Sequence, residues 1–202
     1  MLTEFLVAVL VIEITPGPNL AYLAALSATR GRAAGLAATA GVALGLSTHA
    51  VAAAFGVGTL IAEHAWAYEL LRWGGVAFLV WLAYEGWTGE RGTSPADAPR
   101  KCGRAGLFWR GYWNNVLNPK SALFFVAVVP RFLDPGHGST HRLALLGAIY
   151  VGVATAVHTG VVLLAGALRP FLAGGDRQRV VRRVLSGFLL LLALWLAWGT
   201  RR

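Results

Sequence analysis

Two proline-containing polar motifs interrupt apolar segments, and they constrain the fold of this chain more than any other feature. The first is Thr15-Pro16-Gly17-Pro18-Asn19, and the second, with the sequence NNVLNPK, occupies residues 114–120. A helix inside a bilayer normally satisfies its backbone hydrogen bonds internally, because lipid offers no other partner. A proline removes one of these bonds and restricts the residue before it. The motifs therefore predict two broken helices whose free backbone groups form a binding site, as in many transporters.

The composition indicates that the chain is a membrane protein, which is the setting in which such helix breaks are informative. Of the 202 residues, 56% are hydrophobic and only 13% are charged, whereas a soluble domain is nearer half apolar and a quarter charged. Residues 33–62 and 143–168 contain no Asp, Glu, Lys or Arg, and each run exceeds the roughly 20 residues that a helix needs to cross the hydrocarbon. The single cysteine, Cys102, excludes an internal disulfide and a cysteine-based metal cage. We expect an all-α integral membrane protein with no cofactor.

The pattern of apolar segments predicts six transmembrane helices in one transporter domain. Their approximate ranges are 5–27, 34–61, 70–87, 107–133, 143–168 and 184–198. A polar loop at 89–106 divides the chain into two halves of three helices, about 1–88 and 107–202, and each half begins with a proline-broken helix. Because three is an odd number, the second half enters the membrane from the opposite side. The expected architecture is two inverted three-helix repeats, which build many secondary transporters.

The basic residues predict the orientation of these helices. The net charge is +9, but the Lys and Arg residues gather in the short connections, so nucleic-acid binding is not expected. The first, third and fifth connections hold eleven of them, and the opposite side holds five. Connections rich in Lys and Arg remain in the cytoplasm. Both termini are therefore expected outside the cytoplasm.

The two breaks supply the candidate substrate-binding residues. A half-helix that restarts near Asn19 presents free N–H groups and a positive dipole end, which suit a carboxylate. Lys120 lies near the middle of its segment, where a charge costs about 2.5–3.5 kcal/mol on insertion scales and usually faces the bundle interior. The alternatives are an ordinary proline kink and a Lys120 side chain that extends to the membrane interface. The candidates are Thr15, Pro16, Gly17, Pro18, Asn19, Asn115, Asn118, Pro119 and Lys120.

Three further polar residues inside the predicted helices are candidates for proton coupling or a polar relay: Glu13, His49 and His158. Glu13 either pairs with Lys120, carries a proton, or binds backbone groups that the prolines release. The two histidines either contact substrate or relay protons, or they simply bridge helices by hydrogen bonds. In contrast, the spacing of Gly41 and Gly45 predicts close helix packing.

The motifs together resemble the LysE/RhtB family of bacterial amino-acid exporters. The resemblance rests on Thr15-Pro16-Gly17-Pro18-Asn19, on Gly41-x3-Gly45-x3-His49, on residues 71–82, and on the stretch from Phe108 through Asn118-Pro119-Lys120 to Phe132, and it extends over essentially the whole chain. It implies efflux of amino acids or close derivatives across the bacterial inner membrane, by a multi-pass protein and without ATP hydrolysis. The chain departs from the family pattern near His158, where such proteins often carry an acidic residue and this chain has an imidazole, and at Glu13, which is not part of the motif.

A secondary transporter that exchanges amino acids, most economically against protons, is the favoured interpretation. The alternative is a divalent metal-ion exporter that uses Glu13, His49 and His158 as ligands, although these groups are few and scattered. An enzyme is not expected, because the chain lacks the HExxH, GxSxG and nucleotide-loop motifs. The expected partners are a small amino-acid substrate and the lipid bilayer. The sequence leaves a homo-oligomer open.

Overall fold

A computed structural model describes residues 2–15, 17–55, 64–88, 103–132, 139–172 and 175–199, and all secondary-structure elements in this part of the chain are helices. Two short elements within it depart from α-helical geometry: η1 is a π-helix and η2 is a 3-10 helix. The elements are α1 (Leu2–Ile14), α2 (Pro18–Arg30), α3 (Arg32–Ala54), α5 (Ala65–Thr88), α6 (Arg104–Val116), α7 (Pro119–Leu123), η1 (Phe124–Val128), η2 (Val129–Phe132), α8 (Ser139–Ala167), α9 (Arg169–Leu172) and α10 (Gly175–Gly199).

Both predicted helix breaks are present, and they have the same construction. Helices α1 and α2 meet at an angle of 55°, and α2 begins with Pro18 after the extended residue Gly17. Helix α7 likewise begins with Pro119 after Asn118, whose side chain accepts a hydrogen bond from the backbone N–H of Lys120. A proline is tolerated at the first helical position because its missing N–H would have no helical partner there. Each motif therefore ends one half-helix and starts the next.

Several predicted boundaries need correction. Helix α6 begins at Arg104, so the polar loop does not extend to residue 106, and residues 89–102 lie outside the described part. Helix α3 ends at Ala54 rather than near 61, and residues 56–63 are not described. Helix α10 begins at Gly175, but its apolar part is residues 183–198, which matches the predicted segment. The charged residues before that part are compatible with a helix because Arg and Gln are good helix formers.

Length and composition identify fewer membrane spans than the sequence analysis predicted. Among the described residues, α3 and residues 141–167 of α8 are long and apolar enough to cross a bilayer, and the bent pair of α1 and α2 adds a third. The other helices are either too short in their apolar part, such as residues 183–198 of α10, or carry more polar and charged residues, such as Glu69 and Arg72 in α5. The all-helical membrane class is supported, and the six-span arrangement remains a prediction.

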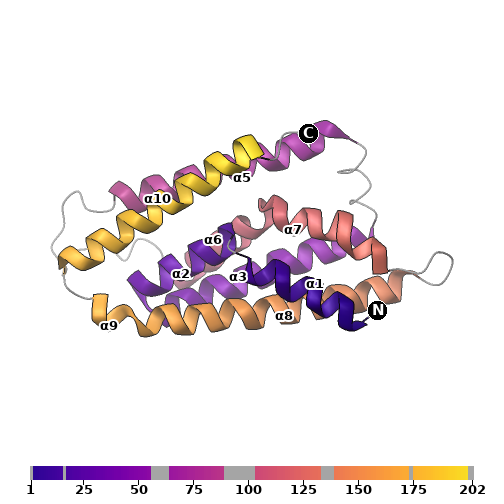
Figure 1. The fold of residues 1–202 in the computed structure, drawn as a ribbon, viewed down its shortest axis with the longest axis horizontal. Coiled ribbons are helices and arrows are strands. Elements are labelled where there is room, and N and C mark those ends of the chain that lie inside the picture. Colours follow the sequence, from indigo (N-terminus) through magenta and orange to yellow (C-terminus); the bar gives the residue numbers. More distant parts are fainter. Residues whose placement is uncertain are drawn as a thin grey trace.

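The breaks lie near the middle of an elongated bundle (Figure 1). Helices α5 and α10 run side by side along one edge, and α8 runs along the opposite edge. Helix α3 packs against α6 and α8, while α1 and α2 pack against α8. The chain therefore brings the α1–α2 break and the α6–α7 break together in the interior, although they are about one hundred residues apart in sequence.

Glycines allow α3 and α6 to approach at backbone distance, as the glycine spacing predicts. A Cβ atom at Gly41 would overlap the carbonyl group of Phe108, and one at Gly111 would overlap the carbonyl group of Ala38. At Gly45 a Cβ atom would lie 2.8 Å from the Cβ of Asn115. This close contact fixes the position of α6, and with it the second break.

We expect substitution of Gly41 by alanine to destabilise the protein, because the obstructing atoms belong to backbone and cannot rotate away. Overpacking of this kind costs about 1–3 kcal/mol, occasionally more, so the melting temperature of the detergent-solubilised protein should fall by several degrees. Gly152→Ala is the matched control, because a Cβ atom there meets nothing within 4 Å. Equal melting temperatures for the two variants would contradict the packing argument.

Candidate functional site

A small cavity with charged groups of both signs lies where the two breaks meet. We call it the charged cavity. Its wall combines residues from both breaks with residues of α1 and α8: Glu13, Gly17, Asn19, Leu20, Asn118, Lys120, Ser121 and His158. Six of these eight positions were singled out from the sequence. The folded chain thus gathers most of the predicted polar residues around one space.

Glu13 is almost completely buried on the α8 side of this cavity, with 5% of its surface exposed. The Tyr150 hydroxyl donates a hydrogen bond of 2.6 Å to its Oε1. Its Oε2 lies 3.1 Å from Nε2 of His158, which is itself only 1% exposed. A buried carboxylate needs such partners, because isolated charge is costly away from water. The structure gives Glu13 these two side-chain partners rather than the backbone partners or the Lys120 partner considered from the sequence.

The Lys120 ammonium reaches across to the first break. Its Nζ donates a hydrogen bond of 2.8 Å to the carbonyl oxygen of Thr15, just beyond the C-terminus of α1. A Cβ atom at Gly17 would lie 3.4 Å from the same Nζ atom. The cation therefore sits at the negative end of the α1 dipole and satisfies a carbonyl group that the break leaves free. This placement favours an interior role for Lys120 over extension to the membrane interface.

Amide side chains connect the two breaks directly. The Asn114 Nδ2 group donates a hydrogen bond of 2.8 Å to Oδ1 of Asn19, and both side chains are buried. Next to it in the sequence, Asn115 donates a 3.2 Å bond to the Ser121 hydroxyl, which tightens the second break. These bonds fix α6 and α7 relative to the start of α2.

The two predicted relay histidines occupy different environments. His158 lines the charged cavity beside Glu13. His49 instead lies near the second break, with its Nε2 atom 3.2 Å from the carbonyl oxygen of Asn115 and its ring 6.4 Å from that of Phe125. The structure therefore brings His158 and Glu13 together and leaves His49 as a contact between α3 and α6.

The remaining predicted residues divide between the cavity and its surroundings. Gly17, Asn19, Asn118 and Lys120 line the charged cavity, whereas the Thr15 hydroxyl bonds back to Val11 at 2.7 Å. Pro16 lies outside the described residues. Pro18 and Pro119 line a second cavity described below, and Asn115 is fully buried beside Ser121.

Sequence reasoning missed Asn114, Ser121 and Tyr150 as site residues. Tyr150 had a detectable signal, because it precedes His158 by eight residues on α8, and a spacing of eight places side chains on one helix face. Ser121 lies close enough to Tyr150 for a side-chain hydrogen bond. Asn114 belonged to the second motif, but nothing in the sequence predicted which of its asparagines would face the first break.

Stacked aromatic rings pack around Tyr150, the residue that binds Glu13. The Tyr150 ring stacks on Phe124 at a centroid distance of 4.3 Å and meets Phe125 edge-on at 5.1 Å. Phe5 of α1 extends the cluster, 6.0 Å from Phe124. Tyr150 therefore connects the aromatic cluster with the charged cavity, because its ring packs in the cluster while its hydroxyl binds Glu13.

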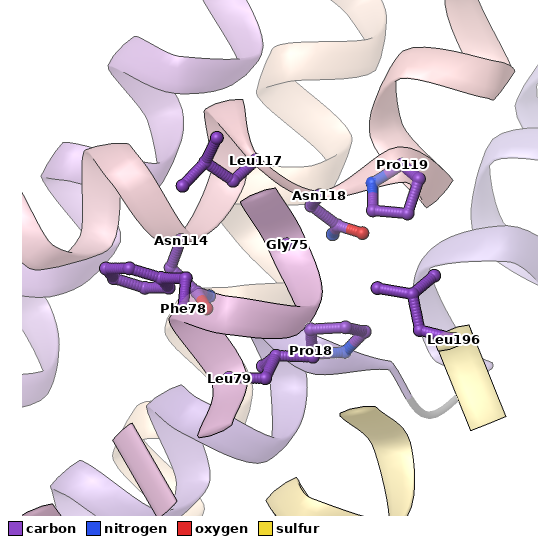
Figure 2. Close-up of a pocket in the computed structure, with 9 residues that line it drawn as sticks. All are labelled: Pro18, Gly75, Phe78, Leu79, Asn114, Leu117, Asn118, Pro119 and Leu196. Atoms are coloured by element: carbon purple, nitrogen blue, oxygen red, sulfur yellow. The ribbon is translucent and has the colours of Figure 1, made fainter. Parts of the chain in front are cut away.

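A second cavity lies on the other side of the crossing breaks, between them and the α5–α10 pair (Figure 2). We call it the proline cavity. Pro18 and Pro119, the first residues of the two restarting helices, face it together with Gly75 and Phe78 of α5. Its polar groups come from Asn114 and Asn118, and Asn118 also lines the charged cavity.

The described residues include no group of three or more His, Cys, Asp and Glu side chains placed to hold a metal ion. Glu13 and His158 offer only two such side chains. The positive charge of Lys120, which lines the same cavity, would also repel a metal cation. What the arrangement does offer is one anionic and one cationic group facing the same small space, with a hydrogen-bonded tyrosine and histidine at the anionic end.

Comparison with known proteins identifies the family of this chain. Residues 10–200 match the family described as LysE type translocator. The chain belongs to the LysE family. Relatives of this LysE chain include the homoserine/homoserine lactone efflux protein of Salmonella typhimurium, 27% identical over 96% of this chain and 94% of the relative. The threonine efflux protein of Escherichia coli strain K12 is 28% identical over 68% of each chain.

A third relative, the uncharacterized membrane protein YahN of Escherichia coli strain K12, is 30% identical over 91% of this chain and 82% of its own length. No solved structure is significantly similar to this LysE chain. The family match and the apolar helices together identify it as a transmembrane transport protein.

Proposed function

We propose that this LysE chain is a secondary transporter that exports amino acids or close derivatives across the bacterial inner membrane in exchange for protons. The observation that carries the proposal is the charged cavity, in which two helix breaks bring Lys120 and Glu13 to the wall of one small space. The family match and the efflux proteins among the relatives support the same activity.

The charges of the cavity complement those of an amino acid. The α-carboxylate of a substrate would bind Lys120 and the N-terminus of α2, whose first turn presents free N–H groups near Asn19. The α-ammonium group would bind Glu13, which already accepts hydrogen bonds and lies close enough to Lys120 to interact electrostatically. Binding would replace the contact between Lys120 and the Thr15 carbonyl, and so would couple the substrate to the first break.

The packing supports the inverted repeat of two three-helix units. Gly17-Pro18-Asn19 and Asn118-Pro119-Lys120 occupy matching positions at the starts of α2 and α7. The long helices after each break also correspond, because α3 packs against α6 of the other half and α8 packs against α1 and α2. The last helices of the two halves, α5 and α10, pair with each other. Each half thereby packs against the broken helix of the other, as alternating access about a central site requires.

The proton would be carried by the pair of Glu13 and His158. Both are buried, and the Tyr150 hydroxyl gives Glu13 a partner in addition to the histidine. Titratable groups inside a membrane protein commonly mark proton pathways. A proton and the ammonium group of a substrate would compete for the Glu13 carboxylate. Binding of one would therefore release the other, as exchange of substrate for protons requires.

Purified protein in proteoliposomes tests the activity. Vesicles preloaded with one amino acid should take up labelled amino acids from a panel by counterflow, and a pH gradient should accelerate net transport in the direction opposite to the proton. Empty liposomes and the Lys120→Met protein are the controls. Transport of divalent metal ions without any amino-acid movement would instead favour the metal-ion exporter.

The distribution of basic residues predicts the orientation of the transporter. With eleven Lys and Arg residues on one side and five on the other, both termini should lie outside the cytoplasm. A cysteine added after Arg202 in a Cys102→Ser background should react with a membrane-impermeant thiol reagent in spheroplasts. A second protein with Ala33→Cys, at the exposed start of α3 in the first connection, should react only after lysis. The reverse labelling pattern would overturn the orientation.

A further inference from the structure

We propose that three arginines at one end of the bundle bind the phosphate group of an anionic phospholipid. They are Arg30 at the end of α2, Arg32 at the start of α3 and Arg169 at the start of α9. We call them the arginine cluster. Such a site goes beyond the export of amino acids, because it concerns the lipid around the transporter and lies away from the helix breaks.

The fold brings these arginines together from both halves of the chain. Helix α9 packs against α2 and α8 at one end of the bundle (Figure 1). There the Arg169 guanidinium lies against Gly31, and a Cβ atom at Gly31 would be 2.9 Å from one of its terminal nitrogens. Gly31 has a φ of 92°, which favours glycine, and its missing side chain leaves room for the guanidinium. Arg169 therefore lies beside the backbone that joins Arg30 to Arg32.

The Arg32 side chain is held in place by α8. Its Nε group donates a hydrogen bond of 3.2 Å to the carbonyl oxygen of Leu163. Its Cγ atom lies so close to Gly166 that a Cβ atom there would overlap it. A guanidinium group has five N–H donors, so the bond from Nε leaves the terminal nitrogens for another acceptor. Because the side chain is already fixed, a ligand would lose less entropy in ordering it.

The positive charges of the cluster are not balanced by the protein. All three side chains are exposed, and across the described ranges none of them forms an ion pair with a carboxylate. Other arginines of the chain do have partners, since Arg72 pairs with Glu69 and Arg110 packs over the Trp81 ring. Like charges repel one another, so the cluster favours an anion. Guanidinium groups bind phosphate oxygens in pairs, which makes a phosphate a suitable ligand.

The apolar surface beside the cluster indicates a lipid rather than a soluble anion. Leu36 follows Arg32 by one helical turn, and Leu163 accepts its hydrogen bond; both leucines are 41% exposed. Leu168, next to Arg169, is 55% exposed. Acyl chains could pack on these leucines while the phosphate meets the arginines. The orientation proposed above places this end at the cytoplasmic leaflet, where anionic lipids attract basic residues.

Lipid binding can be measured without transport, on the purified protein in a neutral detergent. Phosphatidylglycerol should raise the melting temperature by several degrees, because a ligand that binds only the folded state stabilises it. The same concentration of zwitterionic phosphatidylcholine should raise it less, and inorganic phosphate should leave it unchanged. Native mass spectrometry should detect phosphatidylglycerol bound to the protein.

Substitutions locate the site. Arg30→Gln and Arg169→Gln should each weaken phosphatidylglycerol binding by about fivefold, the usual effect of one basic residue near an anionic lipid surface. The triple variant that also carries Arg32→Gln should bind about one hundredfold more weakly. Arg142→Gln is the matched control, because it removes the same charge near the start of α8, at the far end of this helix from Arg169. It should bind phosphatidylglycerol as the wild-type protein does.

Three results would overturn the assignment. The triple variant could bind phosphatidylglycerol like the wild-type protein, or Arg142→Gln could weaken binding as much as Arg169→Gln, which would show a response to net charge alone. Equal stabilisation by inorganic phosphate would assign the cluster to a soluble anion. None of these results depends on amino-acid transport, so they test the lipid site separately from the proposed function.

Discussion

Lys120→Met should abolish export while the protein still inserts into the membrane. The Lys120 ammonium supplies the cationic group of the charged cavity and binds the Thr15 carbonyl of the first break. Methionine keeps the length of the side chain but removes the charge, so a substrate carboxylate loses its main partner. Loss of a charge-assisted bond in a buried site typically costs about 1.5–3 kcal/mol, and loss of positioning adds to this, so we expect counterflow at least about one hundred times slower.

A second basic residue gives the control for this prediction. Arg110 also lies in the broken segment, on α6, but its guanidinium group packs over the Trp81 ring at 4.9 Å rather than facing the cavity. Arg110→Met should therefore retain most of its transport. Membrane fractionation and detergent chromatography of both variants establish that they are inserted and folded. Efflux at the wild-type rate from folded Lys120→Met would refute the role of Lys120.

Glu13→Gln should uncouple transport from the pH gradient. The glutamine keeps an oxygen for the Tyr150 hydroxyl, but it cannot bind a proton or pair with a protonated His158. Net efflux driven by a pH gradient should fall by at least about tenfold, while exchange of amino acid at equal concentrations continues at a reduced rate. The reduced rate follows because the neutral amide attracts a substrate ammonium group less strongly than a carboxylate.

Two further variants separate a coupling role from a structural one. Glu69→Gln removes a carboxylate that pairs with Arg72 on α5, away from the cavity, and should leave pH-driven efflux intact. Tyr150→Phe preserves the stacking on Phe124 and removes the hydroxyl group, which binds Glu13 and lies near Ser121. It should shift the pH dependence of efflux without abolishing it. If Glu13→Gln keeps the wild-type pH dependence, Glu13 is structural and His158 becomes the coupling candidate.

The motifs at the breaks were predictable because their chemistry is local. A proline inside an apolar segment removes a backbone bond wherever the segment lies, so the breaks after Ile14 and Val116 could be predicted from sequence. The same holds for the glycine contact of α3 with α6, since a missing Cβ at Gly41 and Gly45 leaves room for a neighbouring backbone. The lysine near the middle of its segment likewise indicated an interior position.

The partners of the polar groups could not be predicted, because they depend on which helix faces which. Glu13 was expected to pair with Lys120 or with free backbone, yet its partners are Tyr150 and His158 on α8, more than one hundred residues away. The boundaries near residues 61 and 106 were also missed, since hydropathy reports burial in lipid and not where helical backbone ends.

By itself the sequence determined the membrane class, the two breaks and the family resemblance, because composition, proline chemistry and motif spacing are properties of the chain. Only the tertiary structure decided how the breaks are used. It placed Lys120 against the first break, Glu13 between Tyr150 and His158, and Asn114 against Asn19. It also separated His49 from the charged cavity. Contacts between distant segments follow from the packing of whole helices, whose faces combine many weak apolar interactions that no local pattern records.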